Sequence, residues 1–161
     1  MDKLQVIKDK IVDAVEVERL VNRWKLKDDT IVFTNGCFDL LHKGHFEYLA
    51  KAASLGDRVV IGLNSDASVK ALKGENRPIN NEEARSLGLA SLHLSDAIVV
   101  FDGDTPAALI ELIEPDVLVK GGDWNKEDIV GGDFVEGNGG KVEVIKTTDG
   151  YSTTSIINRL N

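Results

Sequence analysis

Short β-type runs alternate with segments of helical spacing from Thr30 to the end of the chain. The β-type runs cover residues 31–34, 58–63, 97–101, 117–120 and 141–145. Between and after them, apolar residues at a helical period predict helices near residues 44–55, 66–72, 82–94, 106–113 and 153–160. Strands that alternate with helices are typical of βαβ units with right-handed crossovers. The pattern therefore predicts an α/β fold, a Rossmann-like three-layer α/β/α domain with a five-stranded parallel sheet.

Residues that favour helix starts support two of these boundaries. Asn81 precedes Glu82 and Glu83, which predicts an N-cap followed by an acidic first turn. Thr105 precedes Pro106, which predicts a cap followed by a proline at the first helical position.

Residues 1–27 differ in character from the rest. Apolar residues that include Leu4, Ile7 and Ile11 roughly keep a helical period between Lys, Asp and Glu side chains. This predicts an N-terminal helical extension over residues 1–27, which packs either on the domain or on a second subunit. The chemistry is expected in a domain formed by residues 28–161.

Composition narrows the class of protein. A chain of 161 residues with 42% apolar and 29% charged residues fits one globular domain. A net charge of −8 argues against nucleic acid as a partner, because neutralisation of phosphates drives such binding. No apolar run approaches the roughly 20 residues that span a bilayer, and no secretory signal opens the chain. The single cysteine fits a reducing compartment. Together, these features predict a cytoplasmic protein that binds no membrane.

The most informative polar positions follow the first β-type run. Two of the three histidines, His42 and His45, stand where the strand gives way to a helix, and a spacing of three places them on one face. Gly44 between them lacks a Cβ and lets a bulky anion approach the backbone. A helix N-terminus binds anions through its unpaired N–H groups and partial positive charge. These features favour a polyphosphate site at this turn.

Two other interpretations of the histidines remain open from the residues alone. They can be metal ligands with Asp39 or Cys37 as a third, although the chain has one cysteine and His93 lies far away in the sequence. Either imidazole can also be an ordinary packing residue.

The turn closely resembles the His-x-Gly-His signature of the nucleotidylyltransferase superfamily, whose α/β fold is shared with class I aminoacyl-tRNA synthetases. The resemblance extends from about Asp28 to Leu160. It includes, in order, residues 62–66 (GLNSD), 72–74 (LKG), 77–80 (RPIN), 119–123 (VKGGD) and 149–154 (DGYSTT). Together these motifs are most similar to those of the adenylyltransferase domains that make ADP-heptose.

This resemblance implies that residues 28–161 form a nucleotidylyltransferase domain. It would transfer AMP from ATP, bound with Mg²⁺, to D-glycero-β-D-manno-heptose 1-phosphate, giving pyrophosphate and ADP-heptose for lipopolysaccharide core synthesis. The alternatives are a cytidylyltransferase that acts on glycerol 3-phosphate or a similar polyol phosphate, and a non-catalytic nucleotide-binding module. The attacking phosphate oxygen is already ionised at neutral pH, so such a site needs positioned cationic donors rather than a protein base.

The expected partners are therefore ATP and a sugar 1-phosphate, within a homo-oligomer. Some relatives carry a fused kinase, for which 161 residues leave no room. A separate kinase is expected to supply the sugar 1-phosphate.

The resemblance, together with the positions of the residues, predicts three groups of site residues. The catalytic residues are His42, His45 and Lys73. The nucleotide-binding residues are Asn35, Gly36, Phe38, Gly44, Asn64, Arg77, Tyr151, Ser152, Thr153 and Thr154. The substrate-binding residues are Asp39, Lys70, Lys120, Gly121, Asp123 and Trp124, and no protein side chain is assigned to a metal ion.

Several of these residues also have a simple structural explanation. Asp39 either holds the turn or orients a metal-bound water, and Trp124 either covers the ligand or packs. Lys70 and Lys73 suit a solvated helix end as well as a phosphate. For Arg85, on the next helix, a surface salt bridge is about as good an explanation as a functional role.

The last motifs leave similar choices. Residues 152–154 can cap a helix or face a triphosphate. Arg77 is held extended by the following proline, and its guanidinium can bind a phosphate through two hydrogen bonds. Related cytidylyltransferases have an arginine where this chain has Thr147 beside Lys146, which argues mildly against that activity. The glycine-rich segment 121–140 is interpreted as a loop that covers the substrate.

Overall fold

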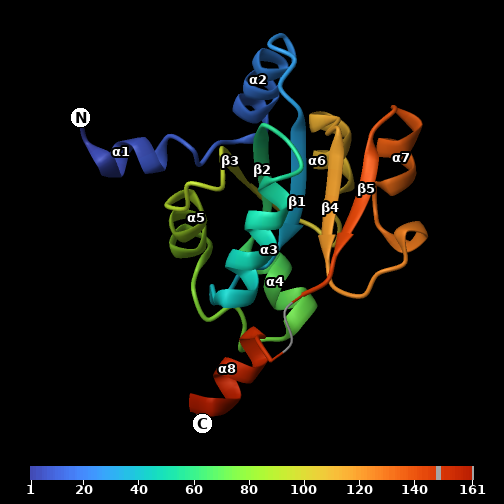
Figure 1. Cartoon of the computed structure of the whole chain (residues 1–161). Coiled ribbons are helices and arrows are strands. Elements are labelled where there is room, and N and C mark those ends of the chain that lie inside the picture. The colour runs from blue at the N-terminus through green and yellow to red at the C-terminus, as the bar shows by residue number, and fades with distance from the viewer. Residues whose placement is uncertain (148–149, 161) are drawn as a thin grey trace.

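The computed structural model of the chain describes residues 1–147 and 150–160, and a parallel sheet organises this part of the molecule (Figure 1). Its five strands are β1 (Ile31–Gly36), β2 (Arg58–Asn64), β3 (Ala97–Phe101), β4 (Val117–Gly121) and β5 (Lys141–Ile145). They stand in the order β3-β2-β1-β4-β5, and every neighbouring pair is parallel. The predicted five-stranded parallel sheet is confirmed. The strand order reverses between β1 and β4, which is where ligands bind in open sheets of this kind.

Helices cover both faces of the sheet. One face carries α2 (Ala14–Lys25), α6 (Ala107–Ile113) and α7 (Gly132–Gly137), and the other carries α3 (Lys43–Ala53) and α5 (Glu82–Ala90). Successive side chains of a strand point to opposite faces, so the buried Phe33 of β1 joins the first core and its neighbour Val32 joins the second. The result is the predicted α/β/α sandwich.

Three further helices complete the described chain. They are α1 (Lys3–Lys8), α4 (Asp66–Lys73) and α8 (Thr153–Leu160), and a short 3₁₀ turn, η1, covers Lys126–Asp128. α8 lies beyond the carboxyl ends of the strands, at the bottom of the view in Figure 1. Among the described residues, no helix combines the length and apolar character needed to cross a membrane.

Residues 1–27 contain two helices, α1 and α2, separated by a non-helical stretch at residues 9–13, and they pack on the rest of the chain. Val17, Val21 and Trp24 of α2 are buried in the same core as α6 and β1. Ahead of α2, Ile11 forms a parallel bridge with Ile98 of β3. The extension therefore contributes to the core beneath the sheet.

Two predicted helix boundaries were wrong. Pro106 is itself the N-cap residue of α6, which begins at Ala107, so the predicted cap was placed one residue too early. The helix predicted over residues 82–94 ends at Ala90, because the chain turns there toward β3. At the start of α5, by contrast, the Asn81 side chain accepts a hydrogen bond from the Ala84 backbone N–H as predicted.

Candidate active site

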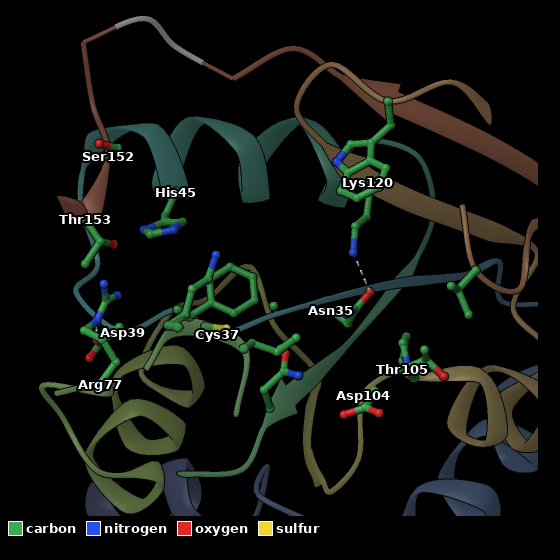
Figure 2. A pocket seen from close by; sticks show the side chains of 18 of the residues that line it. Asn35, Cys37, Asp39, His45, Arg77, Asp104, Thr105, Lys120, Ser152 and Thr153 are labelled. Atoms are coloured by element: carbon green, nitrogen blue, oxygen red, sulfur yellow. Dashed lines mark hydrogen bonds and ion pairs between the residues drawn. The ribbon is translucent and has the colours of Figure 1, made fainter. Parts of the chain in front are cut away.

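Two adjoining cavities open at the carboxyl ends of β1 and β4. Their volumes are about 600 Å³ and 330 Å³, and they share a wall formed by residues 35–38, His45 and Lys120 together with the start of α8. Of the predicted site residues, all except Lys70 and Asp123 line one or both cavities. The fold therefore gathers residues from β1, α4, β4 and α8 at the switch in strand order (Figure 2).

The two histidines stand at the first turn of α3, as their spacing predicted. His42 is the N-cap residue, and its ring stacks on the ring of His45 with 3.9 Å between centroids. The Nδ1 atoms of both imidazoles are enclosed and have no hydrogen-bond partner among the described residues. Buried polar atoms are normally paired, so two unpaired ring nitrogens in one turn are unusual and are a feature of functional sites.

Burial keeps both imidazoles neutral at physiological pH. It lowers the pKa of His45 to about 4, helped by the neighbouring His42 and opposed by a hydrogen bond with the Leu40 backbone. Burial also lowers the pKa of His42. A phosphate placed beside these rings would reverse the effect, because a nearby anion favours the charged form.

The metal interpretation of the histidines finds no support in the described residues. They contain no group of three or more His, Cys, Asp or Glu side chains that could hold a metal ion. Cys37 lines both cavities, but burial raises the pKa of its thiol although Lys73, Arg85 and Arg77 act in the opposite direction. It therefore stays protonated.

The turn that carries the histidines has an unusual backbone. Phe38 adopts a left-handed conformation with φ of 44°, which costs free energy for a residue that is not glycine. Its ring is buried, lies 5.3 Å from the His45 ring, and fills the space where a side chain on Gly36 would be. At Gly44, an added Cβ would stand 3.1 Å from the His42 ring, so the glycine lets this ring lie close to the backbone, and a larger residue would displace it by a few tenths of an ångström.

Asp39 holds the turn rather than offering a free carboxylate. Its side chain is 1% exposed, and both oxygens are occupied by the Arg77 Nε at 2.6 Å and by the backbone N–H groups of Ile79 and Asn80 at 2.8–2.9 Å. Burial by itself raises the pKa of Asp39, but these hydrogen bonds outweigh it and hold the pKa below its usual value. Of the two predicted roles, the contacts support the structural one.

The same contact orients Arg77. Because Nε is bound to Asp39, the two terminal nitrogens of the guanidinium remain on the cavity side, and Figure 2 shows them pointing toward Thr153 and His45. Lys73, the last residue of α4, lines the same larger cavity. Lys70, one turn earlier, lies outside both cavities and pairs with Glu75 at 2.6 Å.

For Arg85, the sequence left a surface salt bridge and a functional role open, and the structure shows a buried residue instead of a surface one. Its side chain is fully buried, and it donates hydrogen bonds to the backbone carbonyls of Cys37 (2.7 Å), Asn64 (2.8 Å) and Asn80 (3.0 Å). It also pairs with Asp66 at 2.8 Å. One guanidinium thus ties the turns after β1 and β2 to the loop that carries Arg77. Its position on an amphipathic helix gave no signal of this role.

Lys120 enters the site from the end of β4. Its ammonium donates a hydrogen bond to Asn35 Oδ1 at 3.3 Å (Figure 2). The same ammonium lies 5.5 Å from the centre of the Trp124 ring. Burial lowers the pKa of Lys120, and only the nearby Cys37 opposes this. Asp123, three residues further along, is exposed and outside both cavities.

Tyr48 of α3 lines the smaller cavity. Its hydroxyl is hydrogen-bonded to Thr34 Oγ1 at 2.5 Å and donates to the Val119 carbonyl at 3.2 Å, so it ties α3 to β1 and β4. Burial raises the pKa of Tyr48 to about 12, opposed by the hydrogen bond with Thr34. Its ring also occupies the space beside Gly121.

The start of α8 lines both cavities through Ser152 and Thr153. Ser152 caps this helix, since its Oγ accepts the Ser155 backbone N–H at 3.0 Å, while Thr153 and Thr154 line the larger cavity. Tyr151 is partly exposed and lines the smaller cavity. Asp149, which belongs to the same motif, lies outside the described residues.

Sequence reasoning missed part of the larger cavity. Asp104, Thr105 and Pro106 line it from the end of β3, and Leu72, Ile129 and Val130 add an apolar patch. The residues after β3 follow a predicted strand and share its edge of the sheet, which is a signal that could have found them. The patch brings α4 together with segment 121–140, which contains η1 and α7; that this segment covers the substrate stays a prediction.

Known proteins resemble this chain in sequence and in fold. A family model described as cytidylyltransferase-like matches residues 33–159. The bifunctional protein HldE of Syntrophotalea carbinolica is 53% identical over 154 residues, which cover 96% of this chain and 30% of that protein. HldE of Geobacter metallireducens is 55% identical over 141 residues, which cover 88% of this chain and 29% of that protein. The chain thus spans about three tenths of the length of these relatives.

Solved structures share the fold. A lipopolysaccharide core biosynthesis protein from Thermoplasma volcanium superposes with a TM-score of 0.61 at 24% identity, covering 77% of this chain and 99% of that one. The pantoate-β-alanine ligase of Francisella tularensis, solved with an ATP analogue and β-alanine, gives a TM-score of 0.58 at 14% identity, covering 94% of this chain and 73% of that one.

Proposed function

This chain belongs to the cytidylyltransferase-like family, and we propose that it transfers AMP from ATP to D-glycero-β-D-manno-heptose 1-phosphate, releasing pyrophosphate and ADP-heptose. The observation that carries the proposal is the stacked pair His42 and His45, which line two adjoining cavities at the switch in strand order and whose buried Nδ1 atoms have no hydrogen-bond partner among the described residues. The identity of 53% to a protein named bifunctional protein HldE supports heptose 1-phosphate as the acceptor.

The reaction is a single displacement at phosphorus. An oxygen of the sugar phosphate forms a bond to the α-phosphorus of ATP, the bond from that phosphorus to the bridging oxygen breaks, and pyrophosphate leaves with the electron pair. No proton has to be removed from the nucleophile. The protein is therefore required to bring two anions together and to stabilise charge on the transferring and leaving groups.

The residues around the cavities suit that task. His42 and His45 would each donate a hydrogen bond to a phosphate oxygen. His45 lines both cavities, which supports the proposal that it would meet the transferring group. Arg77 and Lys73 line the larger cavity and would hold the triphosphate. Thr153 and Thr154, at the start of α8, would contribute hydroxyl groups to the same phosphates.

Mg²⁺ is proposed as the companion of the triphosphate. Because both oxygens of Asp39 are already bound, that carboxylate is not free to act as a ligand. Mg²⁺ is commonly bound through substrate phosphates and retained waters with few protein ligands, and it would add positive charge at the phosphates. Asp104 and Asp128 are the other carboxylates among the described residues that line the larger cavity, and they would hold such waters.

A panel of triphosphates and sugar phosphates tests the proposal. Pyrophosphate release with ATP and heptose 1-phosphate, and not with CTP and glycerol 3-phosphate, is the expected result. Turnover with CTP and glycerol 3-phosphate alone would establish the cytidylyltransferase alternative, and tight ATP binding without turnover on any acceptor would establish the non-catalytic module. A homo-oligomer in the cytoplasm remains a prediction, which light scattering and cell fractionation would check.

A further inference from the structure

Lys120 occupies an unusual place among the cationic residues of the site. Lys73 and Arg77 line the larger cavity, whereas Lys120 lines both. It reaches the shared wall from the end of β4, and Asn35 at the end of β1 receives its ammonium. These are the two strands between which the order of the sheet reverses. Lys120 therefore stands on a strand of the sheet, next to the central strand β1, and not on a loop.

The ammonium of Lys120 is enclosed without a negative partner. Among the described residues, no carboxylate lies within ion-pair distance of it, and its one hydrogen bond, to Asn35 Oδ1, is long at 3.3 Å. The Trp124 ring covers it at 5.5 Å. A half-buried lysine is normally paired, since burial of an uncompensated charge is costly. Two of its three N–H donors are left for a ligand that carries negative charge.

Among the described residues, the other cations near the cavities differ from Lys120 in their partners or in the cavity that they line. Arg77 is held by Asp39, and Arg85 is bound to three backbone carbonyls and Asp66. Arg77 and Lys73 line only the larger of the two cavities, whereas Lys120 lines both. A compact point charge with rotatable donors can serve two phosphate groups at once, which a planar fork suits less well.

We propose that Lys120 is a catalytic residue that bridges the phosphate of the acceptor and the transferring phosphate of the nucleotide where they meet between the two cavities. This inference rests on the proposed function, because it assumes that both substrates carry phosphate. Lys120 keeps its protons throughout: it donates hydrogen bonds to non-bridging oxygens of both groups and reduces their repulsion as the new bond to the α-phosphorus forms. Asn35 orients the ammonium toward the shared wall.

The test compares Lys120→Met with wild-type enzyme. Methionine keeps the length and apolar stem of lysine and removes the charge. We expect kcat to fall by about 10²–10³-fold, the size seen when one donor to a transition-state oxyanion is lost. The dissociation constants of ATP alone and of the sugar 1-phosphate alone, measured by calorimetry, should both rise, each by about tenfold or less.

Two further variants make the comparison decisive. Lys120→Arg keeps a cation at the same place and should recover part of kcat, while Lys51→Met removes an exposed lysine of α3 outside both cavities and should change nothing. If Lys120→Met does not fold, Lys120→Gln takes its place, with the melting temperature recorded for each variant. A change confined to one of the two dissociation constants, or an unchanged kcat, would overturn the bridging role.

The outcome for Lys120 is separable from that of the proposed function. Turnover by the wild-type enzyme decides which nucleotide and acceptor are used. The ratio between Lys120→Met and wild type, measured with whichever pair turns over, decides the role of the lysine. In a protein that only binds its ligands, the two dissociation constants decide it: effects on both support the bridge, and an effect on one refutes it.

Discussion

Burial of the two imidazoles should make the free protein less stable as the pH falls from about 6.5 toward 4. Burial and the neighbouring His42 hold the pKa of His45 at about 4 in the folded protein, against 6.5 for an ordinary histidine. Between these pH values the unfolded chain binds a proton at this position and the folded chain does not. The free energy of unfolding therefore decreases as the pH falls through this window, and the effect is absent above it.

The magnitude follows from the two pKa values. The difference, 6.5 − 4 = 2.5, corresponds to about 3.4 kcal/mol at about 1.36 kcal/mol per pH unit once the pH lies below both values. His45 is only partly enclosed, so solvent screening reduces this, and we expect about 1–2 kcal/mol. The lowered pKa of His42 acts in the same direction. Asp39 does not interfere, because its pKa is lowered from 3.8 and its contribution is lost only at still lower pH.

Urea unfolding between about pH 7.5 and pH 4.5 measures the effect. The comparison needs wild type, His45→Gln, which does not titrate, and His93→Gln, which removes an exposed histidine far from the site. Wild type and His93→Gln should lose stability in parallel, and His45→Gln should lose about 1–2 kcal/mol less. If His45→Gln follows wild type over the whole range, His45 does not have a depressed pKa and the account of a neutral, ligand-ready pair is wrong.

Three substitutions test other parts of the site. His45→Ala should lower kcat by about 10²–10³-fold and change KM for ATP far less, because a donor to the transition state is lost. Steady-state kinetics and a melting curve of the variant separate this result from the loss of a packing residue, which would lower the melting temperature instead. Gly44→Ala should keep or raise the melting temperature, since alanine favours helix by about 1 kcal/mol relative to glycine. The same change should lower kcat/KM about tenfold or more, because the new Cβ stands 3.1 Å from the His42 ring and displaces it. Arg85→Lys should lower the free energy of unfolding, measured with urea, by about 2–4 kcal/mol, because a lysine cannot donate to all the carbonyls that Arg85 binds. A loss below about 0.5 kcal/mol would contradict the conclusion that Arg85 holds these turns together.

The family of the chain and the place of its site were contained in local sequence patterns. Alternation of apolar runs with helical spacing predicted the parallel sheet, because burial on both faces and the helical period are properties of short segments. The histidines of the turn after β1 could be placed for the same reason. A spacing of three, a glycine and a strand-to-helix change lie within a few residues, and the structure stacks the two rings as that spacing suggests.

The roles of the charged residues depended on which distant segments the fold brings together. Arg85 meets the Cys37 carbonyl across 48 positions of sequence, and Lys120 meets Asn35 across 85. Lys70 and Lys73 stand on one short helix, yet Lys73 lines the larger cavity and Lys70 pairs with Glu75 outside it. Whether a charge is buried, paired or free is set by neighbours from other elements, and packing of those elements is not encoded in any single stretch of chain. The sequence by itself determined the sheet and the histidine turn, while only the tertiary structure decided that Asp39 and Arg85 hold the site and that Lys120 stands between its two cavities.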